Sequence, residues 1–405
     1  MINRRKFIGL GTAAAATASF QAVNASASPS RDGGEGEPRI QRMVTLGRTG
    51  LQVSDVSFGS SSLTDADLVR YAFDRGVNFF DTAESYRFGY AEEAIGEALH
   101  GVRDKVVISS KTKAGASDTR KEMMEALEGS LRRLKTDYVD IYFNHAVNDV
   151  SRMKNPEWRE FTDRAKEQGK IRFRAMSGHG SQLVPCLDYA IEQDLADVVL
   201  VAYNFGQDPD FYSRMRDAVS FPAIQPHLPA VLDKAKRNNV GVIAMKTLMG
   251  ARLNDMRPYE WEGGTYAQAA FRWVLSSPRV DALLISMNSK NAINEYLGGS
   301  GDPTIQGGDF NLLARYAYLQ NTRYCRHGCD GCEGACPEGV QIAEVLRTRM
   351  YDVDYGDHAL ATMDYARLGT DAGACATCSH QACLGACPFG LPIAHLTRDA
   401  ATRLA

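Results

Sequence analysis

The chain has 405 residues, of which 44% are hydrophobic, 23% are charged and 9% are aromatic. This composition is too apolar for a disordered chain and too charged for a polytopic membrane protein, so we expect a soluble globular protein. The 46 Lys and Arg residues against 49 Asp and Glu give a formal net charge of -3, and the charge balance therefore predicts no nucleic-acid partner.

The amino-terminal segment has the pattern of an export signal. A basic triplet, Arg4-Arg5-Lys6, precedes a run of small and apolar residues over 7–20 that is too short and too rich in alanine to span a membrane. Ala25-Ser26-Ala27 follows as a cleavage site, and residues 3–9 resemble the twin-arginine motif. We expect a signal peptide over 1–27 that directs the protein through the twin-arginine translocase to the periplasm. An ordinary secretory signal and an uncleaved anchor are the alternatives.

A polar linker is expected over 28–42, and a repeated strand–helix pattern follows it. From residue 50 to 320 the hydrophobic period alternates between about 2 and about 3.6, which indicates βα units. The expected strands are Val53 to Phe58, Val77 to Asp81, Lys105 to Ser110, Tyr138 to Phe143, Ile171 to Met176, Val198 to Ala202, Gly241 to Met245 and Ala282 to Ser286. The clearest helix covers 119–135, and Cys186 is expected to be a core residue of another helix. Eight units predict an α/β fold, a closed (β/α)8 TIM barrel.

Polar side chains follow three successive predicted strands. Asp81 ends the second strand, Tyr86 comes five residues later, Lys111 follows the third strand and His145 the fourth. The carboxyl ends of barrel strands are where chemistry occurs. A tyrosine beside an aspartate-held lysine is a workable general acid, because the ammonium lowers a phenol pKa of about 10, and a neutral histidine can orient a carbonyl. Read singly, the same residues would be a helix cap and ion-pair partners at the barrel mouth.

The segments that carry these four residues resemble the aldo-keto reductases. They read FFDTAESY over 79–86, ISSK over 108–111 and DYVDIYFNH over 137–145, and the resemblance extends through GKIR at 169–172, AYN at 202–204 and AQAAFRW at 267–273. It implies an eight-stranded barrel, which we place over 43–312. It also implies that Tyr86 protonates a small-molecule carbonyl substrate, or deprotonates the alcohol, while a nicotinamide cofactor exchanges hydride.

The resemblance also implies a nicotinamide site at the remaining strand ends. We expect NADP(H) or NAD(H) there, held by Ser177, Tyr203, Asn204, Met245, Lys246 and Ser286. The sequence departs from the family at three of four positions of this site: where Ser, Asn, Gln and Tyr are common, it has Ser177, Gly178, Leu200 and Met245. His179 and Lys246 are additional polar residues that would contact substrate or cofactor, or would lie solvated at the rim.

Eight of the nine cysteines lie between residues 325 and 387 and form two runs, each followed by a proline. The runs are Cys325, Cys329, Cys332 and Cys336, and then Cys375, Cys378, Cys383 and Cys387. They resemble a bacterial two-cluster ferredoxin, in which the fourth cysteine of each run binds the other cluster. The resemblance implies two [4Fe-4S] clusters in a small helical domain over 313–405, for electron transfer or for structure. Zinc sites and disulfides are the alternatives.

Together these features predict an exported oxidoreductase that interconverts a carbonyl and an alcohol. A nicotinamide exchanges two electrons as hydride, whereas each cluster passes one, so coupling the two would require a further carrier or an electron-transfer partner protein. The alternative is a non-catalytic electron carrier or binding protein whose barrel no longer turns over.

Overall fold

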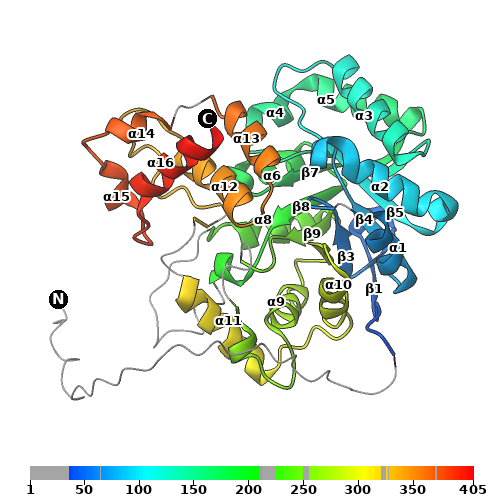
Figure 1. The fold of residues 1–405 in the computed structure, drawn as a ribbon. Helices are drawn as coiled ribbons and strands as arrows, with labels where there is room; N and C mark the ends of the chain where they lie inside the picture. The colour runs from blue at the N-terminus through cyan, green and yellow to red at the C-terminus, as the bar shows by residue number, and fades with distance from the viewer. Residues whose placement is uncertain are drawn as a thin grey trace. The chain divides into compact units, whose positions relative to one another are not determined.

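The computed structural model describes residues 36–63, 65–209, 211, 225–249, 255–320, 325–326, 328–369 and 372–405. The expected signal and most of the expected linker lie outside the described residues. Residues Pro38–Ala405 belong to one unit, whose described residues are drawn in colour in Figure 1. Within the described ranges, no helix is long and apolar enough to cross a membrane.

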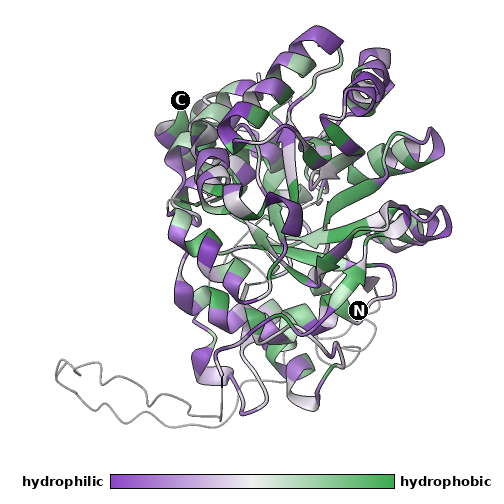
Figure 2. Cartoon of the chain, turned by 90° about the vertical axis from the view of Figure 1, so that its right-hand side faces the viewer, coloured by the Kyte–Doolittle hydropathy of each residue, from purple (hydrophilic) through white to green (hydrophobic). Residues whose placement is uncertain are grey.

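Eight parallel strands close into a barrel, which confirms the predicted fold class. They are β3 (Val56–Gly59), β4 (Phe79–Asp81), β5 (Val107–Thr112), β6 (Val139–Asn144), β7 (Ile171–Gly178), β8 (Val198–Ala202), β9 (Gly241–Met245) and β10 (Ala282–Ser286), and β10 pairs with β3. Around them lie α1 (Ala66–Asp74), α2 (Tyr90–Leu99), α3 (Arg120–Leu134), α4 (Val150–Lys154), α5 (Pro156–Glu167), α6 (Leu183–Glu192), α8 (Leu228–Arg237), α9 (Tyr266–Leu275) and α10 (Lys290–Leu297). Figure 2 shows the apolar strands enclosed by helices whose outer faces are polar.

The first expected strand is wrong in one respect, because the structure divides it in two. β2 (Gln52–Ser54) pairs antiparallel with β1 (Met43–Thr45), and the barrel strand begins only at Val56. The buried Asp55 lies at the break, where its carboxylate accepts hydrogen bonds from the backbone of Val56 at 2.9 Å and from Ser300 at 2.6 Å. Leu46 and Leu51, in the connection between β1 and β2, pack into the barrel interior and close its amino-terminal end.

The helix predicted over 119–135 forms as α3, and its start follows from its sequence. Thr119 and Glu122 make a reciprocal capping box, which satisfies backbone N–H groups of the first turn. The apolar stripe then faces the strands, with Met123 and Leu127 buried. Cys186 is fully buried in α6, where burial raises the pKa of its thiol to about 12. This confirms that Cys186 is a core residue.

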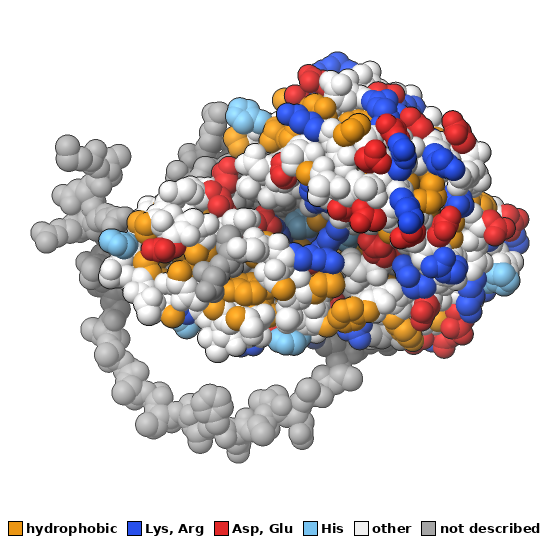
Figure 3. All heavy atoms as spheres, turned by 90° about the horizontal axis from the view of Figure 1, so that it is seen from above, with side chains coloured by type: hydrophobic (Ala, Val, Ile, Leu, Met, Phe, Trp, Pro, Cys, Tyr) orange, Lys and Arg blue, Asp and Glu red, His pale blue; other side chains and the backbone are white. Residues whose placement is uncertain are grey.

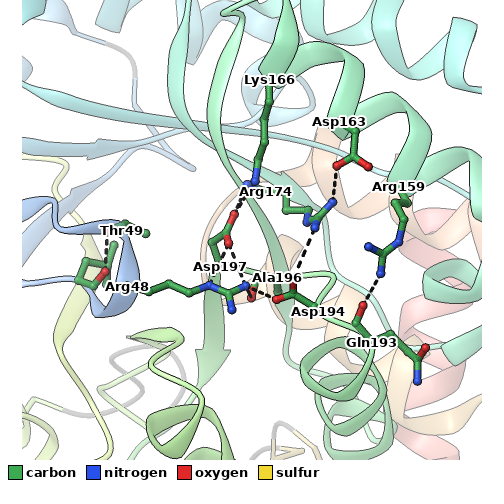
Figure 4. A network of polar contacts seen from close by, with 11 residues as sticks. Arg48, Thr49, Arg159, Asp163, Lys166, Arg174, Gln193, Asp194, Ala196 and Asp197 are labelled. Atoms are coloured by element: carbon green, nitrogen blue, oxygen red, sulfur yellow. Dashed lines mark hydrogen bonds and ion pairs between the residues drawn. The ribbon is translucent and has the colours of Figure 1, made fainter.

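The amino-terminal end of the barrel is held by the charged network in Figure 4. The carboxylate of Asp197, just before β8, accepts from Arg48 at 3.0 Å, from Lys166 at 2.8 Å and from the backbone N–H of Arg174 at 3.1 Å. Arg174 also donates to Asp163 at 2.7 Å. These partners satisfy the charge of Asp197, so the network stabilises the end of the barrel that lies away from the expected chemistry.

The carboxyl-terminal part is helical, as predicted. It contains α11 (Gly307–Gln320), α12 (Ile342–Val353), α13 (His358–Arg367), α14 (Ala374–Thr377), α15 (Ala382–Ala386) and α16 (Ile393–Leu404). α11 runs across the boundary expected at residue 312, and Tyr316 on it stacks on Tyr266 of α9 with 4.4 Å between ring centroids. α12 packs against α13 and α16, and Arg349 pairs with Asp399 at 2.6 Å between α12 and α16. The domain boundaries themselves stay a prediction.

Candidate active site

The lysine and aspartate predicted to support a general acid form a buried ion pair at the carboxyl ends of β4 and β5. Lys111 Nζ donates to Asp81 Oδ2 at 2.5 Å and to the carbonyl oxygen of Thr82 at 2.7 Å. Ser109 Oγ donates to the other oxygen of Asp81 at 2.7 Å. Burial raises the pKa of Asp81 and lowers the pKa of Lys111, while their mutual attraction opposes both shifts. The ion pair with Asp81 therefore fixes the position of the Lys111 ammonium.

The tyrosine and the histidine lie over this pair. Tyr86 begins the 3₁₀ turn η2 (Tyr86–Gly89), and the next two residues, Arg87 and Phe88, have φ of 51° and 56°. Left-handed conformations at non-glycine residues are costly and concentrate at functional sites. Lys111 Nζ is 4.8 Å from the centroid of the Tyr86 ring, and His145 meets that ring edge-on at 5.5 Å between centroids. The structure thus brings all four predicted catalytic residues together.

The protonation of Tyr86 differs from the sequence expectation. Burial raises its pKa well above the usual value, and the negative charge of Asp81 raises it further. The expected lowering by Lys111 does not dominate, because that ammonium is already paired with Asp81. Tyr86 is consequently a protonated phenol, which suits a proton donor to a carbonyl oxygen.

His145 is held in its neutral form. Burial lowers its pKa well below the usual range, and the cations Lys111, Lys113 and Arg152 lower it further. Its Nδ1 is buried and has no hydrogen-bond partner among the residues that the structure describes. A neutral imidazole can donate a hydrogen bond from one nitrogen to a substrate oxygen without adding charge to the site.

A cavity of about 330 Å³ joins the four residues to part of the expected cofactor site. Ser177 on β7, Met245 and Lys246 at the end of β9, and Ser286 on β10 all line it, as do Leu200 and His179. Such a volume suits a small molecule.

Tyr203 and Asn204, also expected in the cofactor site, do not line this cavity. The hydroxyl of Tyr203 donates to Asp208 at 2.7 Å, and Asn204 Nδ2 donates to the carbonyl oxygen of Lys246 at 3.0 Å. Asn204 Oδ1 also accepts from the backbone N–H of Gly206 at 2.9 Å. In this structure the polar atoms of both residues make hydrogen bonds within the loops that follow β8 and β9, and neither residue faces the cavity.

One wall of the cavity comes from the carboxyl-terminal helices, which the sequence reasoning missed. Tyr351 on α12, Tyr355 just after it and Asp364 on α13 line the cavity. Asp364 forms an ion pair with Lys113, and the Lys246 ammonium lies 5.1 Å and 5.2 Å from the ring centroids of Tyr351 and Tyr355. The i, i+4 spacing of the two tyrosines indicates a shared helix face, but no sequence signal says that this face meets the barrel.

The cysteines of the two runs cross over in space. Burial raises the pKa of the thiols of Cys325, Cys329 and Cys332, and the nearby Cys387 from the other run raises all three further. Cys336 lies instead with the other three cysteines of the second run around a small cavity, lined also by Cys375, Cys378 and Cys383. The fourth cysteine of each run therefore lies with the opposite run, as the ferredoxin resemblance implies.

The nine cysteines are all free thiols in this structure. No group of three or more His, Cys, Asp or Glu among the described residues is arranged to hold a single metal ion.

Comparisons with known proteins agree with the barrel fold. The model of the aldo/keto reductase family matches residues 56–260. An L-galactose dehydrogenase from Arabidopsis thaliana is 26% identical over 306 residues, which is 66% of this chain and 91% of that protein. The methylglyoxal reductase YeaE from Escherichia coli is 36% identical over 136 residues, which is 34% of this chain and 44% of that protein.

Solved structures share the fold. An aldo-keto reductase from Klebsiella pneumoniae in complex with NADPH superimposes with a TM-score of 0.51 at 23% identity, covering 69% of this chain and 95% of that chain. The holo form of an aldo-keto reductase from Bacillus halodurans gives a TM-score of 0.54 at 17% identity, covering 68% and 95%. With the family model matched over half of its length, the chain belongs to the aldo/keto reductase family and is an oxidoreductase of that type.

Proposed function

We propose that this protein interconverts a carbonyl and an alcohol on a small substrate, with Tyr86 as the group that gives or takes the proton. The observation that carries this proposal is the convergence of Tyr86, His145 and the Lys111–Asp81 ion pair on one cavity. His145 donates to the substrate oxygen and holds it next to the Tyr86 hydroxyl. The neighbouring ammonium of Lys111 favours the tyrosinate that forms when the proton has left.

The same cavity has room and polar groups for a nicotinamide. The hydroxyls of Ser177 and Ser286 supply hydrogen-bonding groups, Met245 supplies an apolar surface, and Lys246 supplies a positive charge. The solved relative from Klebsiella pneumoniae holds NADPH, and we propose NADP(H) or NAD(H) for this chain. A nicotinamide, when bound, exchanges hydride with the carbon of the substrate.

We further propose that the crossed cysteine groups hold two [4Fe-4S] clusters. Cys325, Cys329, Cys332 and Cys387 form one donor set, and Cys336, Cys375, Cys378 and Cys383 form the other. A cluster passes single electrons, which a partner protein would accept or supply, or it cross-links the helices. Protein purified without oxygen is expected to contain about eight iron atoms. Stoichiometric zinc without broad visible absorbance would refute this assignment.

Export through the twin-arginine translocase to the periplasm is part of the proposal and is supported by the pattern of residues 3–9. Changing Arg4 and Arg5 together to Lys is expected to leave the precursor in the cytoplasm. Fractionation of cells followed by immunoblotting measures this, and normal export of the double variant would indicate the general secretory route.

Tyr86→Phe tests the catalytic proposal. The change removes one hydroxyl and keeps the ring, so we expect turnover to fall by about two to four orders of magnitude while the protein still folds. A panel of small aldehydes, ketones and sugars, assayed with NADPH, NADH and a one-electron dye, identifies the working donor first.

Full activity of Tyr86→Phe with that donor would contradict the mechanism. Absence of turnover with every donor, together with intact clusters, would instead favour the non-catalytic electron carrier.

A further inference from the structure

A second cavity lies beside the catalytic one, between the barrel mouth and helices α12 and α13. Its volume is about 340 Å³. Lys113, Tyr351 and Asp364 line both cavities, so the two adjoin each other. The proposed reaction of a carbonyl at Tyr86 uses none of the polar groups that line only the second cavity.

Positive charge is in excess in this second cavity. Its lining residues that are ordinarily charged at neutral pH are Lys113, Arg152, Arg347 and Arg367 against Glu344 and Asp364. Arg347 is paired with Glu344, while Asp364 is shared by Lys113 and by Arg367, the latter at 3.5 Å. Four cations therefore face two carboxylates. On the face drawn in Figure 3, acidic and basic side chains are interspersed.

Arg152 carries a positive charge that no carboxylate contacts directly. Its guanidinium makes four hydrogen bonds, all to neutral oxygens, namely the carbonyls of Ala114, Ala146 and His145 and the side-chain amide oxygen of Asn144, at 2.7 to 2.9 Å. No carboxylate of the described residues forms an ion pair with it. Burial lowers the pKa of Arg152, and the nearby carboxylates of Asp118 and Asp149 offset this only in part. A buried cation that is incompletely compensated is suited to an incoming anion.

We propose that this second cavity is an anion subsite, which binds a carboxylate or phosphate group of the substrate while the carbonyl lies at Tyr86. The proposal rests on the proposed function, because it extends the same substrate from the catalytic cavity into the adjoining one. It assigns the substrate class as oxo or hydroxy compounds that carry an anionic group. Arg367 and Lys113 contact that group directly, and Arg152 contributes a fixed positive field.

Matched substrates test this inference. Glyceraldehyde 3-phosphate is compared with glyceraldehyde, and glyoxylate with glycolaldehyde, on the complete protein with its clusters. The variant is Arg367→Gln, chosen because this side chain is 52% exposed and its loss is tolerable for folding. We expect the ratio of kcat/KM for the charged substrate over the neutral one to fall about tenfold. Arg403→Gln, which removes a guanidinium of α16 paired with Asp399, is the control and leaves the ratio unchanged.

A binding experiment separates this inference from the proposed function. Inorganic phosphate is titrated calorimetrically into the wild-type protein and into Arg367→Gln, and weaker binding to the variant is expected. This readout remains informative if no carbonyl is turned over, in which case the catalytic proposal fails alone. Equal phosphate binding by both proteins, or an unchanged substrate ratio, overturns the anion subsite. If Arg367→Gln changes only KM for NADPH relative to KM for NADH, the second cavity binds the phosphate of the cofactor and not an anionic group of the substrate. That result would likewise overturn the anion subsite.

Discussion

The two ends of the barrel use charged residues in opposite ways. At the amino-terminal end, Asp197 receives donors from Arg48, Lys166 and the backbone of Arg174, so its charge is satisfied. At the carboxyl end, burial raises the pKa of Tyr86, and burial with the nearby Arg347 lowers the pKa of Lys246 to about 8. The same strands thus carry a satisfied end that stabilises the fold and a perturbed end that can exchange protons and bind ligands.

The largest expected effect comes from Lys111→Met at the perturbed end. Turnover should fall by about two to four orders of magnitude, because the tyrosinate formed during the reaction loses its neighbouring cation. Combining the change with Tyr86→Phe should cost little more, because both disable one acid. Steady-state kinetics of the two single variants and the double variant measure this. Additive losses would show that Lys111 acts independently of Tyr86.

Lys111→Met also leaves Asp81 buried without its cation, which should reduce the free energy of unfolding by about 3–5 kcal/mol. The matched control adds Asp81→Asn, which removes the unpaired carboxylate. We expect the double variant to regain much of the lost stability, measured by chemical denaturation, but none of the lost turnover. Recovery of turnover would mean that the pair serves the fold alone.

Asp197→Asn probes the satisfied end and should have the opposite profile. The amide accepts more weakly from Lys166 and Arg48, so the free energy of unfolding should fall by about 1–3 kcal/mol while kcat stays unchanged. Asp255→Asn is the control, because Asp255 forms an exposed pair with Arg257 and should change neither quantity measurably. A loss of turnover in Asp197→Asn at a temperature where it is folded would break the division between the two ends.

The smallest expected effect concerns pH. Because burial and nearby cations lower the pKa of His145 below its ordinary 6.5, the unfolded chain binds a proton there at pH values where the folded protein does not. Acidification through that range should therefore favour unfolding slightly. In the folded protein, the imidazole nitrogen shifts of His145, assigned by their loss in His145→Gln, should still be those of a neutral ring at about pH 6.5, where an ordinary histidine is half protonated. Half-protonation of this ring at that pH or above would contradict the neutral-donor role.

Local patterns were sufficient for most of the barrel. β8, β9 and β10 begin and end at the predicted residues, because each is a short, mainly apolar run that adjoins a charged residue, namely Asp197, Lys246 and Asp281. The single strand predicted over Val53 to Phe58 is wrong, because it breaks at Asp55. A local pattern does not reveal that the buried Asp55 accepts a hydrogen bond from Ser300, 245 positions later. Tyr86, Lys111 and His145 were predictable because parallel strands end at the same edge of the barrel.

The sequence by itself determined the repeated βα pattern, the four residues at the strand ends and the pairing of each cysteine run with a proline. These are local features of spacing and hydrophobic period, which single segments carry. Only the tertiary structure decided that α12 and α13 bring Tyr351 and Asp364 to the catalytic cavity, and that Tyr86 remains protonated there. Both outcomes depend on which segments pack together and how much water they exclude, which no local spacing specifies.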